Sequence, residues 1–144
     1  MNMIREGDLI AITLEDGEDI VESLTGACER AGITAGMIVS GIGMVRDANI
    51  GYWDGKKYNV DHYGNPSELL SMHGSIALDN GRPSLHIHVN LSGKDHIAFG
   101  GHLVGAKVNN VNEIAILKFF SSSFRRAHDE KTGLSLLRMD GEGR

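Results

Sequence analysis

The segment from Leu85 to Leu91 alternates apolar and polar residues without exception, in the order Leu-His-Ile-His-Val-Asn-Leu. This two-residue period is typical of a β-strand with one buried face. The apolar side chains are expected to face a core, while His86, His88 and Asn90 share the opposite face. Side chains on one face of a strand follow each other at roughly 6–7 Å. His86 and His88 can therefore converge on one ion.

A third histidine, His102, follows Gly100 and Gly101, where the backbone can turn tightly or approach another group closely. Three neutral imidazoles make a nitrogen site of the kind that Zn²⁺ favours, with a fourth position left for water or a ligand. The alternative is that His86 and His88 only form the polar face of a strand, because His-x-His is a common pattern. The remaining histidines are interpreted as solvated or hydrogen-bonded residues: His62, His73, His96 and His128.

The length of 144 residues predicts a single domain, which is large enough to bury a hydrophobic core without disulfide bonds. Its single cysteine, Cys28, excludes an intramolecular disulfide and favours a reducing compartment. The first residues lack the apolar stretch of a signal peptide, and no segment approaches the roughly 18 consecutive apolar residues of a membrane helix. We therefore expect a cytoplasmic protein that does not enter a membrane.

The formal net charge of −5 argues against electrostatic binding of nucleic acid over the whole surface. It does not exclude a local basic patch. Arg125 and Arg126 are too few to form such a patch. We expect both arginines to pair with carboxylates, either within the chain or across a subunit interface.

One helix is predicted. Asp19 and Glu22 have the spacing of a capping box, and Gly32 is suited to end the helix. Cys28 lies beside the apolar stripe of this helix, so we interpret it as a core residue and not as a nucleophile.

The rest of the chain predicts strands, with two-residue hairpin turns at Asp54-Gly55 and Asn80-Gly81 and a glycine bend at residues 41–43. The last residues, 140–144, are predicted to be a disordered tail. The predicted strands cover residues 9–14, 37–40, 48–53, 57–63, 68–78, 85–91, 111–124 and 134–139.

Several motifs in the same order resemble the PPC family, the plants-and-prokaryotes-conserved domain. They are Leu85-His86-Ile87-His88, Gly100-Gly101-His102-Leu103 and the strand around Asn112-Glu113-Ile114. The segment Glu68–Gly74 is also similar to a family block, although Asn65-Pro66-Ser67 departs from the first three positions of that block. The resemblance runs from about Asp8 to Met139 and identifies residues 1–139 as one PPC-like domain.

The resemblance implies an α+β fold in which a mostly antiparallel sheet packs on one main helix and the protein assembles as a homotrimer. Prokaryotic members are described as DNA-binding by analogy with plant relatives, in which AT-hook segments with an Arg-Gly-Arg core precede the domain. This chain contains no Arg-Gly-Arg. Plant members commonly lack the full histidine set, whereas this chain has His86, His88 and His102.

Our first hypothesis is a homotrimer that binds a divalent metal, most simply Zn²⁺, through His86, His88 and His102, with an unidentified small-molecule ligand. Glu113 and Asp95 are candidate general bases, and no residue is assigned as catalytic. One alternative is a DNA-associated regulator, which the net charge and the missing AT-hook disfavour. Another is a protein-interaction module without a metal.

Assembly is expected under all three hypotheses, because one helix cannot cover so many strands and the uncovered apolar surface must be buried between copies. If Phe119 and Phe120 lie in one strand, they point to opposite faces, and one of them should reach a subunit boundary. The residues expected near that boundary are Ile114, Ile116, Leu117, Phe119 and Phe120.

Overall fold

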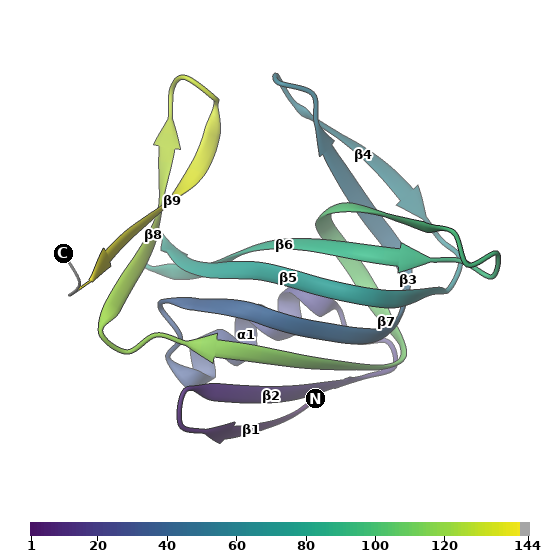
Figure 1. Ribbon diagram of the computed structural model, residues 1–144, viewed down its shortest axis with the longest axis horizontal. Helices are drawn as coiled ribbons and strands as arrows, with labels where there is room; N and C mark the ends of the chain where they lie inside the picture. Colours follow the sequence, from purple (N-terminus) through teal and green to yellow (C-terminus); the bar gives the residue numbers. More distant parts are fainter. Residues whose placement is uncertain (142–144) are drawn as a thin grey trace.

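Nine β-strands and one α-helix make up residues 1–141, the part of the chain that the computed structural model describes (Figure 1). The elements are β1 (Asn2–Glu6), β2 (Leu9–Glu15), α1 (Ile20–Ala31), β3 (Gly36–Trp53), β4 (Tyr58–Tyr63), β5 (Ser67–Asp79), β6 (Arg82–Ser92), β7 (Ala98–Lys118), β8 (Ser122–Asp129) and β9 (Leu134–Gly141). All strand pairs are antiparallel except β5 with β8. The expected mostly antiparallel sheet with one helix is confirmed.

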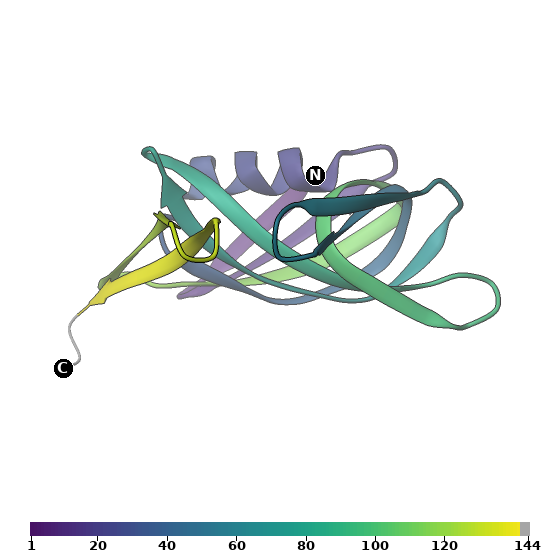
Figure 2. The same ribbon diagram turned by 90° about the horizontal axis from the view of Figure 1, so that it is seen from above.

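Helix α1 lies across one face of the sheet (Figure 2). The Asp19 side chain accepts a hydrogen bond from the backbone N–H of Glu22 at 3.0 Å, and Gly32 adopts the left-handed conformation that ends the helix. Cys28 is fully buried, and this burial raises the pKa of its thiol to about 12, with a further contribution from the charge of Glu29. The interpretation of Cys28 as a core residue is therefore confirmed. It is not an activated thiol.

The sheet closes on itself at its centre. Strand β6 pairs with both β5 and β7, and β3 also pairs with both, so these four strands form a ring. Strands β1 and β2 extend the sheet from β7, and β4 extends it from β3. The core between this curved sheet and α1 includes Ile10, Leu24, Ile38, Ile87 and Ile116.

Two strands are longer than the sequence predicts. β3 is one strand of 18 residues in place of separate short pieces, and its register with β7 shifts at four points, so the predicted bend at residues 41–43 lies within a strand. β7 begins at Ala98, well before the predicted start at residue 111, and ends at Lys118. The predicted continuous strand to residue 124 is wrong, because the chain leaves β7 at Phe119 and re-enters the sheet as β8.

The two predicted hairpin turns differ in outcome. Asn80 and Gly81 form a two-residue turn between β5 and β6, and both have positive φ, as a type I′ turn requires. Between β3 and β4 the turn is displaced by one residue from the predicted pair. Asp54 pairs with Lys57 through a backbone hydrogen bond of 3.1 Å, so the central residues are Gly55 and Lys56.

The β8–β9 hairpin joins the sheet through a single parallel pairing of Leu78 with Arg125. β9 extends to Gly141, so Asp140 and Gly141 belong to a paired strand and not to a disordered tail. The rest of the predicted tail, residues 142–144, lies outside the described residues. Over residues 1–141, no helix combines the length and apolar character needed to cross a membrane.

The residues expected at a subunit boundary divide into two groups. Ile114 and Ile116 are buried in the core that packs on α1, so these two side chains do not reach a subunit boundary, although the strand that carries them remains expected to contribute to it. The strand argument for the two phenylalanines also fails, because neither lies in β7. Phe119 packs on Phe124 with ring centroids 5.2 Å apart, whereas Phe120 is 56% exposed and Leu117 is half-buried.

Candidate metal centre

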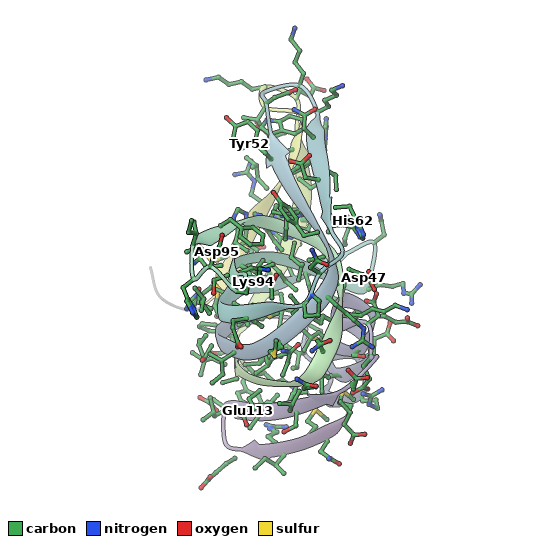
Figure 3. All side chains as sticks on the ribbon, turned by 90° about the vertical axis from the view of Figure 1, so that its right-hand side faces the viewer. Asp47, Tyr52, His62, Lys94, Asp95 and Glu113 are labelled. Atoms are coloured by element: carbon green, nitrogen blue, oxygen red, sulfur yellow. The ribbon has the colours of Figure 1, made fainter. Side chains whose placement is uncertain are left out.

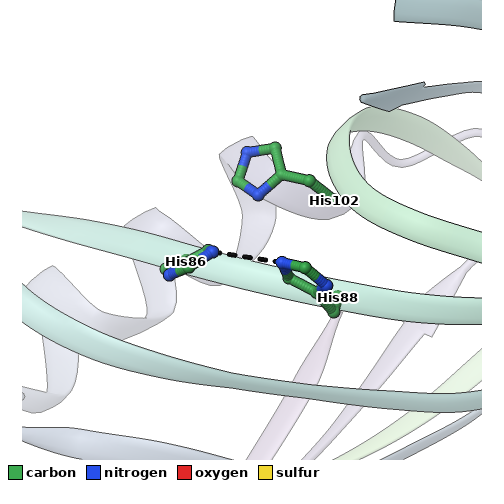
Figure 4. A group of neighbouring side chains, drawn as sticks. All are labelled: His86, His88 and His102. Atoms are coloured by element: carbon green, nitrogen blue, oxygen red, sulfur yellow. Dashed lines mark hydrogen bonds between the residues drawn. The ribbon is translucent and has the colours of Figure 1, made fainter. Parts of the chain in front are cut away.

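The structure brings His86, His88 and His102 together on one side of the sheet (Figure 4). One ring nitrogen from each residue lies within 4.8 Å of the corresponding nitrogen of the other two. Nε2 of His86 and Nε2 of His88 are 3.2 Å apart. These three residues form the only group of at least three histidine, cysteine or acidic side chains with this geometry within residues 1–141.

Strand geometry places each of these rings. His86 and His88 share the solvent-facing side of β6, as the alternation predicts, while Ile87 and Val89 are buried on the other side. His102 is the register partner of His88 in the antiparallel β6–β7 pair. Directly paired residues have Cβ atoms roughly 4.5–5.5 Å apart and project from the same face. The β6–β7 register therefore delivers the third imidazole.

The two glycines before His102 lie inside β7 and do not form a turn. A Cβ atom added at Gly100 would collide with the backbone oxygen of Val89, and one added at Gly101 would lie 3.0 Å from the backbone oxygen of Gly51. Both positions therefore depend on a missing side chain, which lets β7 pass close to β6 on one side and to β3 on the other.

The three rings fit a zinc ion. Two nitrogens bound tetrahedrally at about 2.0–2.1 Å from Zn²⁺ lie roughly 3.3–3.4 Å apart, close to the 3.2 Å between the Nε2 atoms of His86 and His88. Nδ1 of His102 is buried and has no hydrogen-bond partner within the described residues. Buried polar atoms nearly always have a polar partner, and a metal ion bound by the cluster would provide such a partner for this nitrogen.

Burial and neighbouring charges lower the pKa of two histidines of this cluster, His86 and His102. The pKa of His86 is lowered to about 4, first by burial of the ring and then by repulsion from His102, His88 and Arg126. Burial and repulsion from His88 also lower the pKa of His102. A neutral imidazole presents a free lone pair, which is the form that binds a metal ion.

Two members of the cluster, His86 and His102, line a cavity of about 620 Å³. The β3–β4 and β8–β9 hairpins rise on either side of β5 and β6 in Figure 1 and supply its walls. Tyr58 stacks on His102 with ring centroids 4.9 Å apart, and the ring centroids of Trp53 and Tyr58 are 5.2 Å apart. The lining includes Trp53, Tyr58, Ser75, Leu85, His86, His102, Arg126, Leu134 and Leu137.

Neither candidate base lines this cavity. Glu113 lies in β7 opposite Ile42, beside the β1–β2 end of the sheet, and Asp95 lies in the loop between β6 and β7 (Figure 3). Asp95 lines a separate cavity of about 710 Å³ together with Phe99. Within one chain, therefore, neither candidate base is brought to the cavity beside the histidines.

The other histidines stand apart from the cluster. His62, His73, His96 and His128 are exposed, and Nδ1 of His62 lies 3.1 Å from Oδ1 of Asn49. His73 is the register partner of His88 on β5, yet it does not belong to the group of converging nitrogens.

The sequence reasoning missed the cavity residues Trp53, Tyr58 and Arg126. Trp53 and Tyr58 flank the predicted Asp54-Gly55 turn, so the sequence placed them on neighbouring strands. It gave no sign that they line a cavity beside a histidine on β7. The two arginines differ in the structure. Arg125 pairs with Asp140 at 3.4 Å as expected, whereas Arg126 pairs with no carboxylate within the described residues.

Over residues 1–141, the curved sheet, its one helix and the histidine cluster define a small, mostly β domain with a candidate metal centre. The Plants and Prokaryotes Conserved (PCC) domain model matches residues 1–120. The chain therefore belongs to this family, which confirms the resemblance found in the sequence. Among curated proteins there is no match.

Three solved structures illustrate the relationship. A metal-containing protein from Archaeoglobus fulgidus is 37% identical, with a TM-score of 0.85 over 96% of this chain and 99% of that chain. A plant- and prokaryote-conserved (PPC) protein from Pyrococcus horikoshii is 31% identical, with a TM-score of 0.84 over 95% and 93%. A candidate DNA-binding protein from Bacteroides thetaiotaomicron is 23% identical, with a TM-score of 0.90 over 95% and 96%, and this likeness concerns the fold alone.

Proposed function

We propose that this protein binds a divalent transition metal, zinc in the first place, through His86, His88 and His102. The observation that carries the proposal is the convergence of three imidazole nitrogens within 4.8 Å, two of them from histidines that line a cavity, His86 and His102. The lowered pKa values of His86 and His102 support it, because protons then compete weakly with the metal at neutral pH. The metal-containing relative from Archaeoglobus fulgidus, which is 37% identical, supports it as well.

Three protein ligands suit a site that binds a further molecule. A structural zinc site is normally closed by four protein ligands, whereas three leave one position for water or a ligand. When bound there, zinc would supply Lewis acidity toward an oxygen of that ligand. Tyr58 stacks against His102 and thereby restricts the orientation of that ring. The two hairpins that wall the cavity shield this side of the cluster from bulk water.

Metal analysis of protein purified without a nickel column tests the proposal. We expect about one zinc ion per chain by elemental analysis, and we expect zinc added back after chelation to raise the melting temperature. Magnesium serves as the control ion, because it prefers oxygen ligands and should leave the melting temperature unchanged. The proposal is wrong if no metal copurifies and added zinc neither binds nor stabilises the protein.

We further propose that the protein assembles as a homotrimer, as the family resemblance implies. Leu9, Ile42 and Val111 are 49%, 50% and 40% exposed on the face of the sheet that points away from α1. Exposed apolar side chains on one face of a sheet are typical of an interface between subunits. The exposed ring of Phe120 and the half-buried Leu117 are available to the same contact.

Light scattering at micromolar concentration should give a mass of about 47 kDa, three times the 15.6 kDa of one chain. Replacing Ile42 with glutamate should shift this mass toward that of the monomer, because a charge in an apolar interface is costly to desolvate. Lys56→Glu is the control, since Lys56 is exposed in the turn between β3 and β4 and does not lie on this face of the sheet. A monomer peak for the unaltered protein would contradict the assembly.

A further inference from the structure

We propose that the cavity beside the histidine cluster binds a small organic carboxylate, whose negative group pairs with Arg126 while its apolar part lies against Trp53 and Tyr58. This assignment deepens the proposed function by naming the class of ligand, and it rests on the same cavity. The juxtaposition that carries it is an arginine without a carboxylate partner, held at the cavity wall next to three converging imidazoles.

Arg126 is fixed in place by β5. Its Nη2 donates to the hydroxyl of Ser75 at 2.9 Å and to the backbone oxygen of the same residue at 3.3 Å. Ser75 is the register partner of His86 on β6. The guanidinium is therefore anchored beside one member of the histidine cluster, and the anchor comes from the strand next to β6.

The rest of the guanidinium is free to bind an anion. Its Nε and Nη1 groups make no hydrogen bond within residues 1–141, and its planar array of donors matches the two oxygens of a carboxylate. Arg126 is also half-buried, and this burial lowers the pKa of its guanidinium. The negative charge of Asp79 acts in the other direction and raises the pKa by a smaller amount. A partly desolvated charge of this kind gains most from an anionic partner.

The remaining walls favour an organic ligand over a simple inorganic anion. Trp53 and Tyr58 supply aromatic faces from one hairpin, and Leu134 and Leu137 supply apolar surface from the other. The hairpins approach each other at the top, where a Cβ added at Gly133 would lie 4.0 Å from the ring of Trp53. A volume of about 620 Å³ is in the range of small-molecule sites.

Such a ligand could meet both features of the wall at once. Its carboxylate would pair with Arg126, and a second oxygen would lie near His86, which lines the same cavity. The apolar part would then fill the space between the two hairpins. This arrangement explains why a charged residue and an aromatic pair line the same cavity.

Titration of the protein with benzoate and with benzamide tests the assignment, because the two probes have nearly the same shape and differ in charge. Trp53 is the only tryptophan and lines the cavity, so its fluorescence reports binding directly. We expect benzoate to bind at least about 10-fold more tightly than benzamide, as a charge-assisted hydrogen bond provides. Arg126→Gln should remove this preference, and Arg126→Lys should retain part of it.

Arg125→Gln is the matched control, because Arg125 is the neighbouring residue of β8 but is exposed and pairs with Asp140. It should bind benzoate as the unaltered protein does, and the melting temperature of each variant shows whether it is folded. Equal binding of the two probes, or benzoate binding that survives Arg126→Gln in a folded variant, would overturn the proposal. A drop in the mass of Arg126→Gln by light scattering would overturn it too, since Arg126 would then pair with another copy of the chain.

The titration is run on protein without zinc and on protein with zinc added. Dependence of benzoate binding on Arg126 in the zinc-free protein supports the carboxylate site whether or not the metal proposal holds. Zinc binding without any preference for benzoate supports the metal centre and rejects the carboxylate site. The two proposals therefore fail in different ways.

Discussion

Replacing His88 with alanine is expected to lower the zinc affinity of the protein by at least 100-fold. His88 supplies one of only three protein nitrogens, and its Nε2 lies 3.2 Å from Nε2 of His86. Loss of an outer partner of a metal ligand already costs about 10–100-fold in affinity, so loss of a ligand itself should cost more. Because the His88 side chain is exposed, the zinc-free variant should stay within about 0.5 kcal/mol of the unaltered stability.

The difference is measurable as thermal stabilisation. At a zinc concentration 100 times the dissociation constant, binding stabilises the unaltered protein by about 2.7 kcal/mol, whereas a variant with 100-fold weaker binding gains only about 0.4 kcal/mol. For a chain of this size these values correspond to shifts of about 5–10 °C and about 1 °C. His62→Ala is the control, because His62 is exposed on β4 and does not belong to the cluster. Equal zinc shifts in the two variants would reject the metal centre.

Replacing Gly100 with alanine is expected to lower the free energy of unfolding by about 1–3 kcal/mol. The added methyl group would collide with the backbone oxygen of Val89, and backbone cannot rotate away as a side chain can. The collision should push β7 away from β6 at the point where His102 pairs with His88. Zinc affinity should therefore fall as well, although no metal ligand is changed.

Gly105→Ala is the matched control for this substitution. Gly105 lies in the same strand, and a Cβ atom there would meet no atom within 4 Å. We expect its stability, measured by urea unfolding at one fixed protein concentration, to stay within about 0.5 kcal/mol of the unaltered protein. Equal stability of the two variants would contradict the conclusion that β7 must approach β6 closely at Gly100. Because Gly100 is exposed, its burial alone would predict no loss of stability for Gly100→Ala.

The features that the sequence determined are those set by neighbouring residues. The alternation from Leu85 to Leu91 placed His86 and His88 on one face of a strand, and the structure has them there. The spacing of Asp19, Glu22 and Gly32 located the helix and its two ends. These patterns are local because side chains alternate along a strand and recur along a helix with fixed periods. The His86 and His88 pair was therefore visible before any fold was known.

The tertiary structure alone decided what faces the histidines. Trp53, Tyr58 and Arg126 reach the cavity from hairpins far apart in the sequence. Glu113 and Asp95, the two candidate bases, lie elsewhere. His102 joins the cluster through the β6–β7 register, which a local pattern does not specify. Strand pairing and register depend on which buried faces meet and on where glycine permits close approach. The sequence by itself determined which histidines share a strand face, and the closure of the sheet determined the cluster that they form with His102.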